Sequence, residues 1–128
     1  MIFAAGLGTR LKPLTDNLPK ALAPVAGRTL LCYVLMRLRA AGSESFVINV
    51  HHFADKVISY IRETPELAAM DIEFSDERDL LRDTGGGIRY AEPLLASSPC
   101  GRFLVHNVDI VSDLDMHWLE NQVRPDAL

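Results

Sequence analysis

A glycine-rich segment with basic side chains follows the first apolar residues of the chain. Residues 1–5 read MIFAA, and Gly6-Leu7-Gly8-Thr9-Arg10 comes directly after them. Glycines can adopt positive φ and let a ligand approach the backbone, whose N–H groups then bind phosphate oxygens. The Arg10 guanidinium adds a bidentate fork for the same oxygens, and Lys20 adds a second positive charge. We therefore predict an anion-binding loop between residues 6 and 20.

Two common phosphate-binding patterns do not match this loop. A dinucleotide-binding fingerprint requires a third glycine at position 11, where the chain has Leu11, and this disfavours a dehydrogenase. A Walker A loop requires Gly-Lys-Ser/Thr, whereas Gly8 is followed by Thr9 and Arg10. A simple glycine turn with solvated basic side chains is the structural alternative to a binding loop.

The distribution of charge favours a small anionic ligand. The chain has a formal net charge of -4, yet residues 1–28 carry four basic residues and one acidic residue. A positive loop on an acidic protein suits a small anion better than a nucleic acid, whose partners usually present a basic face. With no apolar stretch long enough to span a bilayer and no leader peptide evident, we expect a cytoplasmic protein. Cys32 and Cys100 lack CxxC spacing and are expected to be unpaired thiols.

The remaining sequence alternates between strand and helix patterns. We expect strands over residues 1–5, 45–50, 70–74 and 102–110, and helices over 29–42, 53–63, 86–96 and 114–122. Thr29 is the expected N-cap of the first helix, and Gly42 is expected to end it. This alternation implies crossover connections, a mainly parallel sheet and helices on both faces. The predicted fold is a Rossmann-like, doubly wound α/β domain spanning residues 1–128.

Three unusual segments fall at the carboxyl ends of the predicted strands, where open α/β sheets bind ligands. They are the loop after the first strand, DTGGG at 83–87 and HNVD at 106–109. Asp109 offers the hard oxygen ligand that Mg²⁺ requires, with substrate phosphates as further ligands. The structural alternatives are a strand-end cap for Asp109 and a helix start for DTGGG, with Thr84 as the N-cap.

Other polar and aromatic residues carry weaker signals. Residues 71–83, which include Glu77 and Asp79, contain six acids and two arginines, and most of these charged residues are expected to form a solvated face. Tyr33 and Trp118 are expected to be core or half-buried residues.

The histidines give no strong metal signal. His51 and His52 end the second predicted strand, where adjacent residues point to opposite faces, so one of them could line the site. His106 and His117 show no ligand spacing, so a zinc site is not expected.

The stretch AAGLGTRLKPLTDNLPKALAPVAGRTL resembles the opening signature of the sugar-1-phosphate nucleotidyltransferases, or nucleoside-diphosphate-sugar pyrophosphorylases. In that signature, A-A-G-x-G-T-R-L-x-P-L-T is followed a few residues later by P-K. The segments DTGGGI and FLVHNVDI continue the resemblance, which covers nearly the whole chain. N-acetylmuramate 1-phosphate uridylyltransferases and mannose- and heptose-1-phosphate guanylyltransferases are the members that it resembles most.

The resemblance implies that a sugar 1-phosphate oxygen attacks the α-phosphorus of a nucleoside triphosphate in line and that pyrophosphate leaves. It implies that Arg10 holds the departing pyrophosphate and that Lys20 bridges the α-phosphate and the incoming phosphate. Asp109 is implied to hold Mg²⁺, although the family usually has N-G-D where this chain has Asn107-Val108-Asp109. Gly85 and Gly86 are implied to lie beside the nucleobase. The full set of implied nucleotide-binding residues is Ala5, Gly6, Gly8, Thr9, Arg10, Lys20, Gly85, Gly86 and Asn107.

Members of this family are generally longer, with a second half that binds the sugar and supplies another carboxylate to the metal. The chain thus resembles the N-terminal, nucleotide-binding half of the enzyme, and we expect little turnover from it alone. UTP is the favoured nucleotide because TGGG is most similar to the uridylyltransferases. The alternatives are a GTP-using mannose- or heptose-1-phosphate guanylyltransferase, a transferase for another acceptor such as phosphocholine or a molybdenum cofactor, and a non-catalytic nucleotide-binding regulatory module.

Overall fold

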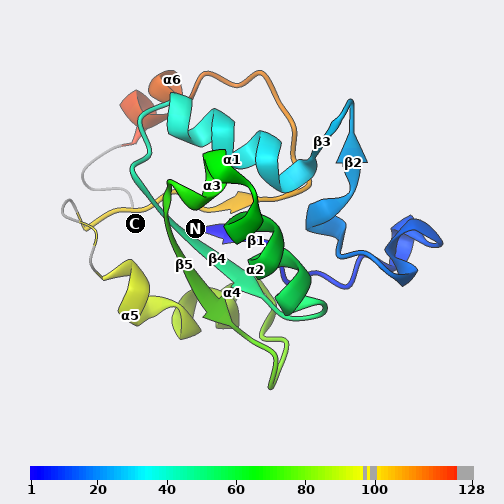
Figure 1. The fold of residues 1–128 in the computed structure, drawn as a ribbon. Coiled ribbons are helices and arrows are strands. Elements are labelled where there is room, and N and C mark those ends of the chain that lie inside the picture. Colours follow the sequence, from blue (N-terminus) through cyan, green and yellow to red (C-terminus); the bar gives the residue numbers. More distant parts are fainter. Residues whose placement is uncertain (97, 99–100, 124–128) are drawn as a thin grey trace.

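A parallel sheet forms the centre of the computed structural model, which describes residues 1–96, 98 and 101–123 (Figure 1). Within these residues the sheet contains β1 (Ile2–Phe3), β4 (Ser45–Val50), β5 (Asp71–Asp76) and β6 (His106–Asn107). The strand order is β5-β4-β1-β6, and every pairing is parallel. Ile2 pairs with Ile48 on one side and with His106 on the other, so β1 lies between β4 and β6. The predicted α/β fold with a mainly parallel sheet is confirmed.

Helices cover both faces of this sheet. One face carries α1 (Leu30–Ala40), α2 (Ala54–Glu63) and α3 (Pro65–Ala68), and the other carries α4 (Asp83–Tyr90) and α5 (Glu92–Leu95) (Figure 1). Successive β4 side chains alternate between the faces: Ile48 and Val50 join the main core, while Val47 packs with Ala91 and Leu95. On the α1 side, α6 (Met116–Gln122) packs Met116 against the main core. The doubly wound arrangement is therefore as predicted.

The connection from β1 to α1 consists of short 3-10 turns and a hairpin. The turns are η1 (Thr9–Leu11), η2 (Leu14–Asp16) and η3 (Lys20–Leu22), and the antiparallel hairpin pairs β2 (Pro24–Val25) with β3 (Arg28–Thr29). Ala21 and Leu22 in η3 are buried in the main core. The connection therefore returns to the core at η3 after the exposed loop that precedes it.

Helix α1 has both of the end signals predicted from the sequence. The Thr29 hydroxyl accepts a hydrogen bond of 3.1 Å from the N–H of Cys32, which caps the start of the helix. Gly42 has a φ of 94°, and the N–H of Ser43 donates to the carbonyl of Leu38 over 3.0 Å. This is the Schellman arrangement, in which a glycine takes the left-handed conformation and the last carbonyls find donors.

Two predicted elements are shorter than expected. Of residues 1–5 only Ile2–Phe3 form strand, because the N–H groups of Ala4 and Ala5 bond to the side chain of Asn49 instead of to a neighbouring strand. Of residues 102–110 only His106–Asn107 form strand, since β6 is the last strand in the sheet order and pairs with β1 alone. Phe103 nearby is 45% exposed.

The helix predicted over residues 86–96 is wrong in both its start and its continuity. Helix α4 begins at Asp83 with Arg82 as N-cap, so DTGGG is helical and Thr84 is not the cap. The chain breaks at Ala91 before α5, because Pro93 has no N–H to donate to the carbonyl of residue 89 and its ring crowds that carbonyl.

Three smaller predictions have mixed outcomes. Cys32 is a buried free thiol as expected, whereas Cys100 lies outside the described residues. Tyr33 is half-buried as expected, but Trp118 is 54% exposed, so the expectation of a core or half-buried tryptophan is wrong. No helix within the described part of the chain is both long and apolar enough to cross a membrane.

Candidate functional site

Gly8 fixes the shape of the loop predicted to bind an anion. Its φ is 65°, in the left-handed region that other residues avoid. A Cβ at Gly8 would lie 2.9 Å from Thr15 Cγ2 and 3.3 Å from Lys20 Cβ. Thr15 is buried, and its hydroxyl donates a hydrogen bond of 2.8 Å to the Gly8 carbonyl. Gly8 is therefore held inside the folded loop, while the neighbouring Thr9 and Arg10 are exposed.

The loop is fastened to the rest of the molecule at two points. At its start, the N–H groups of buried Ala4 and Ala5 donate to Asn49 Oδ1 over 2.7 Å and 3.3 Å. Further along, Lys56 Nζ from α2 donates to the Asn17 carbonyl over 2.5 Å. The Gly6–Arg10 segment, in which every residue except Gly8 is exposed, lies between these anchors.

Lys20 and Asp109 form an ion pair, although 89 positions separate them in the sequence. Asp109 follows β6, and Lys20 begins η3. The hydrogen bond from Lys20 lowers the pKa of Asp109 below its ordinary value, and the positive charges of Lys20 and Arg10 lower it further, against partial desolvation. The structure therefore pairs Lys20 with Asp109 at the carboxyl ends of β1 and β6, and the nearby glycine loop carries Arg10, whose positive charge also acts on Asp109. Their catalytic and metal-binding roles remain predictions.

Val108, where the resembling family usually has glycine, does not point into this site. Its side chain is buried and belongs to the main hydrophobic core. Its N–H donates to the Phe3 carbonyl over 3.1 Å, which extends the pairing of β6 with β1. Asp109, the next residue, lies in the turn after β6, and its side chain is 41% exposed.

The glycines predicted to lie beside a nucleobase form the first turns of α4. Gly85 and Gly86 are exposed, and a Cβ at Gly85 would meet nothing within 4 Å. Gly87 is buried, and a Cβ there would lie 3.0 Å from Glu77 Oε1. Asp83, at the start of the helix, has a φ of 53°, an uncommon conformation for a residue with a side chain. The base-contact role of Gly85 and Gly86 stays a prediction.

A buried polar pair lies behind these two segments and was missed by the sequence analysis. Asn49 is 2% exposed and Glu77 is fully buried. Asn49 Nδ2 donates to Glu77 Oε1 over 3.0 Å, and the N–H of Arg82 donates to Glu77 Oε2 over 3.1 Å. Glu77 is thus an exception to the solvated face expected for most charged residues of 71–83, because its carboxylate has these donors inside the protein. Asp79 is 64% exposed, as expected.

The histidines at the end of β4 have different surroundings. His51 Nδ1 lies 2.7 Å from the Glu77 carbonyl oxygen, and because a carbonyl can only accept, this nitrogen carries the proton. The ring of His52 packs against Phe53 with a centroid separation of 3.9 Å. Neither contact tests the prediction that one histidine lines the site. Among the residues that the structure describes, no three His, Cys, Asp or Glu side chains gather as a metal cluster.

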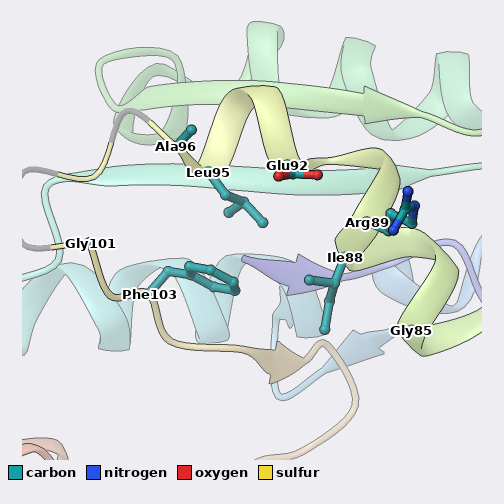
Figure 2. A pocket seen from close by; sticks show the side chains of 8 residues that line it. All are labelled: Gly85, Ile88, Arg89, Glu92, Leu95, Ala96, Gly101 and Phe103. Atoms are coloured by element: carbon teal, nitrogen blue, oxygen red, sulfur yellow. The ribbon is translucent and has the colours of Figure 1, made fainter. Parts of the chain in front are cut away.

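A cleft of about 430 Å³, which Gly85 helps to line, lies between the α4–α5 helices and residues 101–103 (Figure 2). Ile88, Leu95 and Phe103 project into it. The cleft contains none of the three charged residues of the Lys20–Asp109 site. It is therefore separate from the glycine loop, and of the predicted site residues only Gly85 lines it.

Known proteins with similar sequences include two kinds of sugar-phosphate enzyme. The N-acetylmuramate alpha-1-phosphate uridylyltransferase of Caulobacter vibrioides is 45% identical over 123 residues, which are 94% of this chain and 47% of that protein. A mannose-1-phosphate guanyltransferase of Emericella nidulans is 35% identical over 93% of this chain and 32% of its own length. The chain thus spans at most about half the length of these relatives.

Solved structures and a family model give a consistent result. HddC from Yersinia pseudotuberculosis, in complex with GMP-PN, has a TM-score of 0.80 at 27% identity and covers 94% of this chain and 51% of that chain. The model of the family described as nucleotidyl transferase matches residues 1–125, which include the glycine loop, Lys20, α4 and Asp109. The chain belongs to the nucleotidyl transferase family.

Proposed function

We propose that this chain is the nucleotide-binding part of a sugar-1-phosphate nucleotidyltransferase, which joins a nucleoside triphosphate and a sugar 1-phosphate and releases pyrophosphate. The observation that carries the proposal is the ion pair between Lys20 and Asp109 beside a largely exposed glycine loop that carries Arg10. Two cations neutralise phosphate charge, and one carboxylate provides an oxygen ligand for a metal. The uridylyltransferase and guanyltransferase relatives support the same reaction class.

The chain's own residues would act by positioning and by neutralising charge. A sugar phosphate is already an anion, so its oxygen needs no general base to attack the α-phosphorus. The exposed Arg10 guanidinium can hold two oxygens of the departing pyrophosphate. When the substrates bind, Lys20 would leave Asp109 and contact the α-phosphate and the incoming phosphate instead. It would thereby hold the two reacting groups together. Fixed cations of this kind typically contribute a few kcal/mol to transition-state stabilisation.

The carboxylate of Asp109 is the kind of oxygen ligand that a magnesium ion requires. Mg²⁺ is commonly held by one or two carboxylates together with substrate phosphates, and Asp109 offers a partly exposed carboxylate with a lowered pKa. When bound, the ion would neutralise phosphate charge as a Lewis acid. Asn107, two residues earlier, lies at the same sheet edge, and Ala5, Gly6, Gly8 and Thr9 would contribute backbone or hydroxyl groups to the nucleotide.

We propose UTP as the nucleotide. The uridylyltransferases of Caulobacter vibrioides and Neisseria meningitidis are 45% and 41% identical to this chain, compared with 35% for the guanyltransferase of Emericella nidulans. The structure of HddC with GMP-PN favours GTP as the second candidate, since its bound ligand is a guanine nucleotide analogue. A reaction that consumes either nucleotide suits the cytoplasmic location predicted from the sequence.

Thermal-shift titration with UTP, GTP, CTP and dTTP, each with Mg²⁺, tests this proposal. A ligand that binds only the native state stabilises it by about 2.7 kcal/mol at 100 times its Kd. We expect the largest shift with UTP, and a smaller shift for Arg10→Met and Lys20→Met. Arg28→Met is the matched control, because Arg28 is an exposed cation in the β2–β3 hairpin and is not one of the predicted site residues. Equal shifts for all three variants, or no shift with any nucleotide, would refute the proposal.

We also propose that this domain corresponds to the N-terminal half of the longer relatives and that catalysis needs the other half. The relatives of known function are at least about twice as long as the matched region. We therefore expect the 128-residue chain to bind nucleotide but to release little pyrophosphate when sugar 1-phosphate is added. Full turnover by this chain in a pyrophosphate-release assay would contradict the expectation.

A further inference from the structure

The buried side chains of Asn49 and Glu77 connect the two segments that are proposed to hold the nucleotide. We propose that this pair sets the position of the glycine loop relative to the glycines of α4, and that both are positioning residues for the nucleotide, which they do not touch. The inference rests on the proposed function for its consequence, but its structural part stands on contacts within the protein. No local sequence motif assigns a role to either residue.

On the loop side, Asn49 replaces the strand partner that β1 loses. Its Oδ1 accepts the N–H groups of Ala4 and Ala5 over 2.7 Å and 3.3 Å, where the chain leaves the sheet to form the loop. Its Nδ2 then donates to Glu77 Oε1 over 3.0 Å. The direction in which the loop departs is therefore set by a side chain from the neighbouring strand β4.

On the helix side, Glu77 continues the same chain of hydrogen bonds. Its Oε2 accepts the N–H of Arg82, the N-cap of α4, over 3.1 Å. Gly87 packs directly on the pair: a Cβ there would lie 3.0 Å from Glu77 Oε1 and 3.4 Å from Asn49 Nδ2. The third glycine of DTGGG thus lets α4 approach the buried carboxylate. This contact determines where Gly85 and Gly86 stand at the edge of the sheet.

The chemistry of the pair leaves little freedom in the choice of residues. Both oxygens of Glu77 face donors, and the amide of Asn49 must accept on one side and donate on the other. Because the pair is excluded from water, an atom facing the wrong kind of partner has no solvent to replace the lost hydrogen bond. Two apolar residues could fill the space, but the N–H groups of Ala4, Ala5 and Arg82 would then lack acceptors.

Swapping the amide and the carboxylate provides a matched test. In Glu77→Gln one of the two donors faces the Gln amide nitrogen, and in Asn49→Asp two carboxylates face each other. The double variant Asn49→Asp/Glu77→Gln restores every bond: the new carboxylate accepts from Ala4 and Ala5, the new amide donates to it, and the Gln oxygen accepts from Arg82. Volume and total charge are the same in the double variant and in the unaltered chain.

The affinity for Mg-UTP is measured by titration calorimetry at a temperature where each variant is folded by circular dichroism. We expect each single variant to bind about 10- to 100-fold more weakly, in line with one unsatisfied buried hydrogen bond, and the double variant to recover most of the affinity. Ile61→Val, a small core deletion in α2, is the control for general destabilisation and should bind normally. If a single variant does not fold, Gly87→Ala replaces it, since its methyl group would press on the same pair.

Amide hydrogen exchange in the nucleotide-free protein provides a readout that does not depend on binding. The N–H groups of Ala4, Ala5 and Arg82 should exchange faster in the single variants and regain protection in the double variant. Unchanged affinity in the single variants, or a double variant as weak as either of them, would overturn the inference and leave the proposed function intact. Failure of the unaltered chain to bind any nucleoside triphosphate would instead overturn the proposed function, and with it the role given to the pair.

Discussion

Replacing Gly8 by alanine should damage both the stability of the domain and its affinity for a triphosphate. Gly8 has a φ of 65°, and an added Cβ would lie 2.9 Å from the methyl carbon of Thr15. Thr15 is 4% exposed and is held by its own hydrogen bond to the Gly8 carbonyl, so it cannot move away without losing that bond. The new methyl group must therefore displace the loop that carries Arg10.

Two separate effects add to the expected loss of stability. The left-handed conformation costs a residue with a side chain about 1–2 kcal/mol. Overpacking against a buried neighbour costs about 1–3 kcal/mol. Together they give a destabilisation of about 2–5 kcal/mol for Gly8→Ala. With an m-value of about 1–3 kcal/mol/M, the midpoint of urea unfolding should fall by roughly 1 M or more.

Two further variants separate the backbone effect from the steric effect. Gly27 also has a positive φ, 85°, but an added Cβ would meet nothing within 4 Å, so Gly27→Ala should show the conformational cost alone. In Gly8→Ala/Thr15→Ser the clashing methyl group is removed while the hydroxyl that bonds the Gly8 carbonyl is kept, so part of the stability should return. Urea unfolding followed by circular dichroism measures all three. If Gly8→Ala is no less stable than Gly27→Ala, the loop is not packed as described.

The remaining predictions concern the charged groups. Because the pKa of Asp109 is lower in the folded state than in the unfolded chain, the stability that Asp109 contributes is present above about pH 4 and is lost as the pH falls through the folded pKa. In a carboxyl NMR titration, Lys20→Met should raise the Asp109 pKa more than Arg10→Met does. The pKa of Asp79 is lowered to about 2, mainly by the hydrogen bond from the Arg82 side chain. In the same titration this pKa should rise towards its model-peptide value in Arg82→Met. Asp109→Asn should weaken the Mg²⁺-dependent part of nucleotide affinity in calorimetry and leave the part measured in EDTA nearly unchanged, whereas equal losses in both would contradict a metal-binding role. Lys56→Met should weaken Mg-UTP binding several-fold by releasing the Asn17 carbonyl, with Arg62→Met on the same helix as a control that should not.

Much of the fold could be predicted because its elements carry local signals. Strand β4 matches the predicted range 45–50, and the Thr29 and Gly42 signals correctly mark the ends of α1. The failures arise where tertiary contacts override a local pattern. The apolar run 102–110 is a strand only where β1 lies beside it, and the helix expected over 86–96 was extended across Pro93.

The convergence of the charged residues could be anticipated for a topological reason. In a parallel sheet the carboxyl ends of all strands lie at one edge. The order β5-β4-β1-β6 makes β1 and β6 neighbours, so the loop after β1 and the residue after β6 must approach each other. The ion pair between Lys20 and Asp109 follows from that arrangement, even though no sequence pattern links the two positions.

The buried pair behind the site could not be found in this way, although one signal was present. Asn49 interrupts the apolar strand SFVINV, and an amide inside a buried strand requires partners. Glu77, by contrast, stands among five other acids between residues 71 and 83, and nothing in its immediate sequence distinguishes the one that is buried. Its burial is linked to Gly87, ten positions later, because a Cβ there would lie 3.0 Å from Glu77 Oε1 and crowd the carboxylate. The segment DTGGG is therefore constrained from two sides: Gly85 and Gly86 are predicted to lie beside the nucleotide, and Gly87 packs on the pair that holds the loop.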